Sequence, residues 1–127
     1  MALQKHHFGD LEQAIMDVIW KQQNATVRDV VDALRQRRIA YTTVMTVMNR
    51  LASHRILHRA SGQSGAFVYR ARLTREDWCT EASRIAIDDI VRRYGAVAMA
   101  QFVDRLDRVP SDKLAALRRQ VRKGSRR

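Results

Sequence analysis

The sequence predicts a mainly α-helical fold with one short β-hairpin. Apolar residues recur at the spacing of an amphipathic helix over most of the 127 residues, and they alternate only near residues 56–61 and 66–73. Apolar residues make up 46% of the chain and charged residues 29%, which is enough apolar material for a modest core. With one proline and five glycines, the chain is not of a collagen-like or glycine-rich class.

The first two helices are predicted from their capping residues. Asp10 is expected to cap the first helix, with Gln13 at the reciprocal capping position, and the apolar stripe ends near Trp20. Thr26 is expected to cap a second helix, whose C-terminal end carries three arginines.

The third predicted helix, residues 40–55, has an unusual polar face. Val44, Val47 and Leu51 share its apolar side. A solvated helix face usually carries Glu and Lys, but this face has no acid and holds Thr42, Thr43, Met45, Thr46, Asn49, Arg50 and Ser53.

Residues 56–61 and 66–73 predict two strands joined by a flexible tip at residues 62–65. Three helices followed by a hairpin is the order of a winged helix-turn-helix, in which the hairpin is the wing. We therefore expect a DNA-binding domain over residues 1–73 and a helical dimerisation domain over residues 74–127.

The C-terminal helices carry apolar stripes but have too little bulk to form a core alone. A second copy of the chain is the simplest cover, and packing back on the N-terminal domain in a monomer is the alternative. The residues expected at the dimer interface are Trp78, Ile85, Ile90, Tyr94, Phe102 and Leu106.

The charge balance indicates a nucleic-acid partner. Lys and Arg number 24 against 13 Asp and Glu, so the net charge is +11. From Arg28 to Arg72 the sequence contains nine arginines and only two acidic residues, both aspartates. A generally basic surface and attraction to anionic membranes are the alternatives. The chain has no apolar run long enough to span a membrane and no signal-peptide pattern, so we expect a cytoplasmic protein without membrane insertion.

Double-stranded DNA suits the third helix because an α-helix fits the major groove. Threonine methyls and Met45 can touch thymine methyls, and threonine hydroxyls and Asn49 can bond to base edges or phosphates. Arg50 can reach a phosphate or a guanine. The further DNA-binding residues expected are Arg28, Arg59 and Arg70.

Three segments, GDLEQAIMDVIW, TVRDVVDAL and AYTTVMTVMNRLASHRIL, carry a family resemblance. They resemble the penicillinase repressor family of bacterial transcription regulators (BlaI and MecI types, with copper-responsive relatives). The resemblance implies a homodimeric winged-helix repressor of palindromic operators, controlling β-lactam resistance or other genes. No metal, cofactor or enzyme activity is expected, and one cysteine does not fit the paired Cys-x-Cys motifs of the copper branch.

The resemblance also implies a mode of control. In resistance-gene members a membrane-bound sensor protease leads to cleavage of the repressor at an Asn-Phe bond in the dimerisation helices. The matching bond here is Gln101-Phe102, a departure from that pattern. An ordinary core role for Phe102 stays open beside the cleavage role. A basic, architectural protein without sequence preference is the alternative function.

Overall fold

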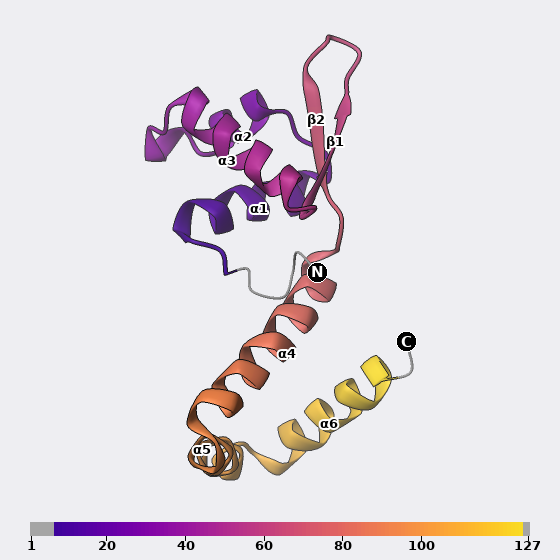
Figure 1. The fold of residues 1–127 in the computed structure, drawn as a ribbon. Helices are drawn as coiled ribbons and strands as arrows, with labels where there is room; N and C mark the ends of the chain where they lie inside the picture. The colour runs from indigo at the N-terminus through magenta and orange to yellow at the C-terminus, as the bar shows by residue number, and fades with distance from the viewer. Residues whose placement is uncertain (1–6, 126–127) are drawn as a thin grey trace. The chain divides into compact units, whose positions relative to one another are not determined.

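The computed structural model describes residues 7–125, and its elements follow the predicted order (Figure 1). The fold is mainly helical with a two-stranded antiparallel hairpin, which confirms the predicted winged helix followed by further helices. The elements are α1 (Asp10–Gln22), α2 (Val27–Ala33), a 3-10 helix (Arg35–Arg37), α3 (Tyr41–Ser53), β1 (Leu57–Ser61), β2 (Phe67–Ala71), α4 (Arg75–Tyr94), α5 (Ala96–Asp107) and α6 (Ser111–Ser125).

The cap predicted for α2 is confirmed, and α4 has a cap of the same kind. The hydroxyl of Thr26 accepts from the Asp29 amide at 3.1 Å, and that of Thr74 accepts from the Asp77 amide at 3.1 Å. The cap of α1 was predicted wrongly. Gly9, not Asp10, is its N-cap residue, and the Glu12 carboxylate accepts from the Gly9 amide at 3.1 Å. Helix α1 therefore begins one residue earlier than a side-chain cap at position 10 requires.

The second helix is shorter than predicted. Helix α2 ends at Ala33, and two of the three arginines expected at its C-terminal end lie in the 3-10 helix that follows. Arg38 comes next with φ of 55°, in the left-handed region. This residue reverses the chain before α3, so the arginines belong to the connection rather than to α2.

The contacts of the chain divide it into two compact units, with the division between Ile85 and Ala86 inside α4. The first unit holds nearly all the buried side chains. Its core is built from the apolar faces of α1, α2 and α3, including the predicted side of α3, and from the base of the hairpin. Its members are Ile15, Met16, Ile19, Ala25, Val27, Val30, Val44, Val47, Met48, Leu51, Ile56, Leu57, Tyr69 and Trp78.

The hairpin is tied to this core through Tyr69. Strands β1 and β2 pair antiparallel, with Arg59 opposite Tyr69 and His58 opposite Arg70. The main chain of Tyr69 also exchanges two hydrogen bonds with Ala25, of 3.0 Å and 2.8 Å, in the connection between α1 and α2. The base of the wing is therefore fixed both by its own pairing and by this third segment.

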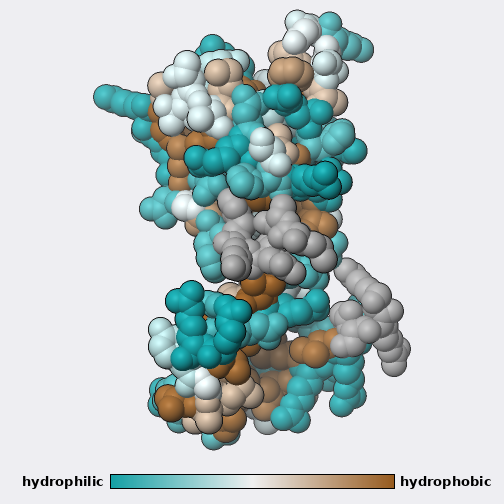
Figure 2. Space-filling view, in the orientation of Figure 1, coloured by the Kyte–Doolittle hydropathy of each residue, from teal (hydrophilic) through white to brown (hydrophobic). Residues whose placement is uncertain are grey.

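The second unit is built differently. Among its residues whose burial is described, 86–123, Ala98 alone is buried. Figure 2 shows hydrophobic residues, in brown, at the surface of the second unit. Over the described part of the chain, no helix is both long and apolar enough to cross a membrane.

Candidate nucleic-acid interface

Helix α3 presents the acid-free polar face that the sequence predicted. The buried positions Val44, Val47, Met48 and Leu51 alternate with exposed ones at helical spacing. Five of the predicted contact residues are exposed on α3: Thr42, Thr43, Met45, Thr46 and Arg50. Their role in binding DNA stays a prediction, but their side chains are free of the core.

The threonines on this face differ in what they can offer. The Thr46 hydroxyl donates to the carbonyl oxygen of Thr42 at 2.8 Å. Its hydrogen is therefore in use, while its lone pairs and its methyl group remain available. Thr46 can accept a bond from a base amino group or contact a thymine methyl, but in this rotamer it cannot donate.

The start of α3 leaves main-chain donors without a side-chain cap. Ala40 is the N-cap residue and has no side chain that could accept from the first turn. Arg28, on α2, places its guanidinium 4.9 Å from the centre of the Tyr41 ring. Positive charge and helix-start amides thus lie close together, as phosphate binding requires.

Arg50 is exposed but has an acidic neighbour. Its Nη2 lies 3.8 Å from Oε2 of Glu12 on α1. A pair of this kind at a protein surface contributes about 0–1 kcal/mol, so DNA can replace the carboxylate at low cost. The Arg50 guanidinium is therefore directed toward Glu12 on α1, and this weak ion pair leaves it able to move to a DNA phosphate or base.

Asn49 stands apart from its neighbours on α3, because it is half-buried and its side chain is already bonded. Its Oδ1 accepts from the Tyr69 hydroxyl at 2.6 Å and from Nη1 of Arg59 at 3.0 Å. The structure thus brings the predicted residues Asn49 and Arg59 together. Tyr69 was missed at the sequence level, because no local pattern links a strand tyrosine to a helix residue twenty positions earlier.

The two predicted wing arginines lie on opposite faces of the hairpin. Arg59 pairs with Tyr69, whereas Arg70 pairs with His58, so successive positions point to opposite sides. Both arginines are exposed. Arg59 is on the side that meets α3, with its guanidinium 4.2 Å from the centre of the Phe67 ring. Arg70 is on the other side and does not join this group.

The residues expected at a dimer interface divide into two groups. Trp78 is buried in the core of the first unit, where its ring stacks on Phe8 with centroids 4.4 Å apart. Of the others, Ile90, Tyr94 and Leu106 are exposed. Ile85 and Phe102 are half-buried, and Gln101, before the candidate cleavage bond, is exposed on α5.

One pKa shift concerns the second unit. Arg92 and Arg93 flank Asp89 on α4, with Nε of Arg93 2.9 Å from the carboxylate. The hydrogen bond from Arg92 is the main cause that lowers the pKa of Asp89 below its usual value. Desolvation opposes it, and the charge of Arg93 and the bond from Arg93 lower the pKa further. This cluster lies on the part of α4 that belongs to the second unit.

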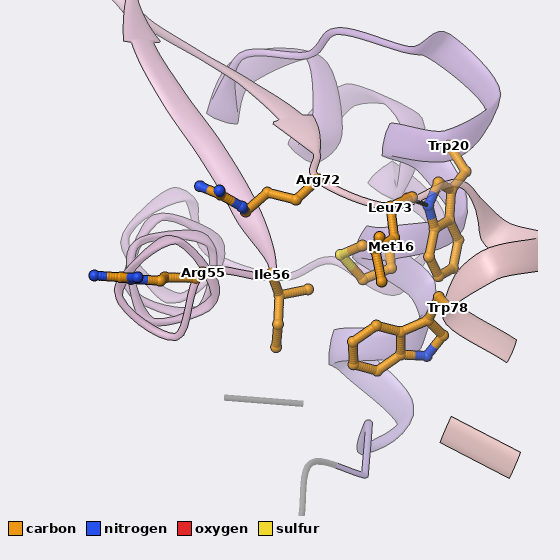
Figure 3. Close-up of a pocket in the computed structure, with 7 residues that line it drawn as sticks. All are labelled: Met16, Trp20, Arg55, Ile56, Arg72, Leu73 and Trp78. Carbon is orange, nitrogen blue, oxygen red and sulfur yellow. Dashed lines mark hydrogen bonds between the residues drawn. The ribbon is translucent and has the colours of Figure 1, made fainter. Parts of the chain in front are cut away.

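A cavity of about 250 Å³ lies in the first unit beside the start of α4 (Figure 3). Its apolar side includes Trp20 and Trp78, and the side chains of Arg55 and Arg72 extend away from these two rings. Its seven lining residues place no carboxylate or hydroxyl toward a ligand. Such a lining has no converging polar groups to orient a small molecule. The lining residues are Met16, Trp20, Arg55, Ile56, Arg72, Leu73 and Trp78.

Comparison with known proteins adds two relatives. Both are the transcriptional regulator BlaI of Mycobacterium tuberculosis, from strains CDC 1551 / Oshkosh and ATCC 25618 / H37Rv. Each is 53% identical to this chain over 51 residues, which cover 39% of this chain and 37% of the relative. The matched segment thus spans little more than a third of the length of these relatives.

Two solved structures align along most of the chain. A ZitR mutant of Lactococcus lactis has a TM-score of 0.47 and 9% identity, covering 97% of this chain and 77% of that one. A MarR mutant from E. coli has a TM-score of 0.45 and 14% identity, covering 90% and 77%. The model of the penicillinase repressor family matches residues 8–123. Since this match leaves out only the two ends, the chain belongs to the penicillinase repressor family.

Proposed function

We propose that this chain is a DNA-binding transcriptional repressor, and not an enzyme, that inserts α3 into the major groove of an operator. The main support for this proposal is the polar face of α3, which is exposed and has no acidic residue, while the opposite face of α3 is buried in the core. Membership of a family of repressors supports the same function. Helix α3 itself carries no carboxylate on this face, so the residues of α3 do not repel DNA phosphates as the helix approaches.

The wing and the flanking arginines supply the positioning contacts. Arg28 and Arg59 are exposed cations beside α3, Arg28 near its first residue Tyr41 and Arg59 on the wing beside Asn49. We expect both to contact phosphates, which fix register without reading sequence. Arg70, on the far face of the hairpin, is expected to contribute less than Arg59.

Homodimerisation on a palindromic operator is the second part of the proposal. The second unit exposes apolar side chains on α4, α5 and α6, and their contact with water is unfavourable. A second copy of the chain is the simplest partner that would bury them. Two linked α3 helices would read two half-sites, so each binding event raises the effective concentration of the other.

The regulated genes and the mode of release rest on the family alone. We propose resistance-type genes as the targets, action in the cytoplasm, and relief by cleavage at Gln101-Phe102 after a membrane sensor protease responds to a β-lactam. Phe102 is half-buried within α5, so cleavage there would need local unwinding. Incubation with the cognate sensor and a β-lactam should yield a fragment ending at Gln101, and an intact chain rules out this route.

The decisive experiment is selection of DNA from a random pool by the full chain, followed by titration of the selected duplex and a scrambled duplex. A repressor of this kind should prefer the selected duplex by about 10³-fold or more at physiological salt. The selected sequence should show an inverted repeat. A ratio near one would instead support the alternative of a basic, architectural nucleic-acid-binding protein, which the net charge of +11 favours.

A further inference from the structure

Asn49 lies on the α3 face proposed to meet DNA, yet its carbonyl oxygen faces the protein. Oδ1 accepts one bond from the Tyr69 hydroxyl and one from the Arg59 guanidinium. A guanidinium has only donors, so the atom that faces it must be the oxygen of the carboxamide and not the nitrogen. Both lone pairs of that oxygen are therefore occupied, and one of the two bonds is charge-assisted.

This arrangement conflicts with base reading by Asn49. The specific contact of asparagine with adenine is bidentate: the amide group donates to N7, and the carbonyl oxygen accepts from the N6 amino group. With Oδ1 used by Tyr69 and Arg59, only the amide hydrogens remain. Reading adenine would require breaking two protein hydrogen bonds, one of them to a buried tyrosine.

The same bonds join three segments of the first unit. Tyr69 is 1% exposed, its main chain exchanges two hydrogen bonds with Ala25, and it lies opposite Arg59 of β1 in the register of the hairpin. Its hydroxyl reaches α3 through Asn49, so the angle between α3 and the wing is set at this point. Arg59 is then held on two sides, by Asn49 and by the ring of Phe67.

We propose that Asn49 is a positioning residue that aligns the wing with α3 and orients Arg59 toward a DNA phosphate, and that it does not read a base. This inference rests on the proposed DNA-binding function and deepens it. A guanidinium already held in place loses less side-chain freedom on meeting a phosphate, so Arg59 binds more tightly than a mobile arginine at the same site.

The test uses the full chain and the duplex that the unmodified chain selects from a random pool. Asn49→Ala and Tyr69→Phe should each weaken binding about three- to tenfold. The double variant should bind about as Asn49→Ala alone does, because both changes remove one connected group. Base preferences in a repeated selection should stay the same at every position, since no base contact has been lost.

Salt dependence gives a reading that simple loss of stability would not change. The logarithm of the binding constant falls linearly with the logarithm of the salt concentration, with a steeper slope for more phosphate contacts. If Asn49 orients Arg59, Asn49→Ala should make this slope shallower by up to about the value of one phosphate contact, and Arg59→Ala should do the same. Combining the two should lower it no further. Ser83→Ala removes one exposed hydroxyl outside this group and serves as the matched control, with unchanged binding expected.

Two results would overturn the inference. One is a relaxed preference at a single base pair in Asn49→Ala while Tyr69→Phe binds normally, which identifies Asn49 as a base reader. The other is full additivity of the two changes. If thermal unfolding shows that Tyr69→Phe does not fold, the cycle of Asn49→Ala with Arg59→Ala decides in the same way. Equal binding of the unmodified chain to selected and scrambled duplexes would reject the proposed function itself, before any variant is read.

Discussion

The two units of this chain use their apolar residues in opposite ways. In the first unit the large apolar side chains of α1, α2 and α3 are buried against one another and against the hairpin. In the second, Tyr94, Val97, Val103 and Val121 are more than half exposed. The first unit therefore forms a hydrophobic core within a single chain, whereas the second unit leaves most of its large apolar side chains exposed to solvent.

This difference indicates what each unit depends on. A unit with its own core has a stability set by that core and independent of protein concentration. A unit with exposed apolar faces is stabilised when a second copy binds to them, so its free energy of unfolding rises with protein concentration. Binding to a single half-site should therefore be a property of the first unit, and avidity for two half-sites a property of the second.

The largest expected effect comes from placing charge on the exposed apolar face. Val103→Glu combined with Leu106→Glu should convert the proposed dimer to a monomer, because two desolvated carboxylates per chain would be buried at its interface. Affinity for a two-half-site duplex should then fall about 10²- to 10⁴-fold through loss of avidity. Sedimentation gives the oligomeric state, and titration of the duplex gives the affinity.

Gln120→Glu provides the control for that pair, since it adds a carboxylate at an exposed polar position of the same unit. It should sediment as a dimer. If the Val103 and Leu106 variant also sediments as a dimer with unchanged operator affinity, the apolar face is not the dimer surface.

A core substitution sharpens the contrast between the units. Leu51 is fully buried in the first unit, and Leu51→Ala should lower the free energy of unfolding by about 2–5 kcal/mol at any protein concentration. Leu106→Ala, at a position that is 45% exposed, should have an effect that depends on concentration. Denaturant unfolding over a hundredfold range of concentration separates the two, and identical concentration dependence would contradict the comparison.

Arg50→Ala should change DNA binding without changing dimerisation. We expect a loss of about 1–3 kcal/mol on the selected duplex, because Arg50 is exposed on the α3 face. A loss confined to the selected sequence indicates base reading. An equal loss on scrambled DNA with a shallower salt slope indicates a phosphate contact. Unchanged binding of both duplexes would remove Arg50 from the interface.

The sequence predicted the helices and the hairpin because their signals are local. The period of Val44, Val47, Met48 and Leu51 is visible without knowing what they pack against. Local signals could not show that the Asn49 carboxamide turns inward to Tyr69, because that bond depends on where the hairpin docks. The packing of Trp78 on Phe8 could not be predicted for the same reason, since an apolar residue at the start of a helix has the same local pattern whether it contacts its own chain or another.

The smallest expected effect tests where the first unit ends. The indole of Trp20 donates to the carbonyl oxygen of Leu73 at 2.9 Å, just before α4 begins. Arg75, in the first turn of α4, lies over the Trp20 ring and is 3.0 Å from the Asp17 carboxylate. These contacts join the beginning of α4 to α1, so Trp20→Phe should lower the free energy of unfolding by about 1 kcal/mol.

Because all of these contacts lie within the first unit, the loss in Trp20→Phe should be the same at every protein concentration, measured by denaturant unfolding. Phenylalanine keeps an aromatic ring and removes the donor, so the measured loss combines the hydrogen bond with the packing of the larger indole. A loss that grows on dilution would mean instead that the start of α4 is held by the dimer. The first turns of α4 would then belong with the exposed apolar faces rather than with the completed core.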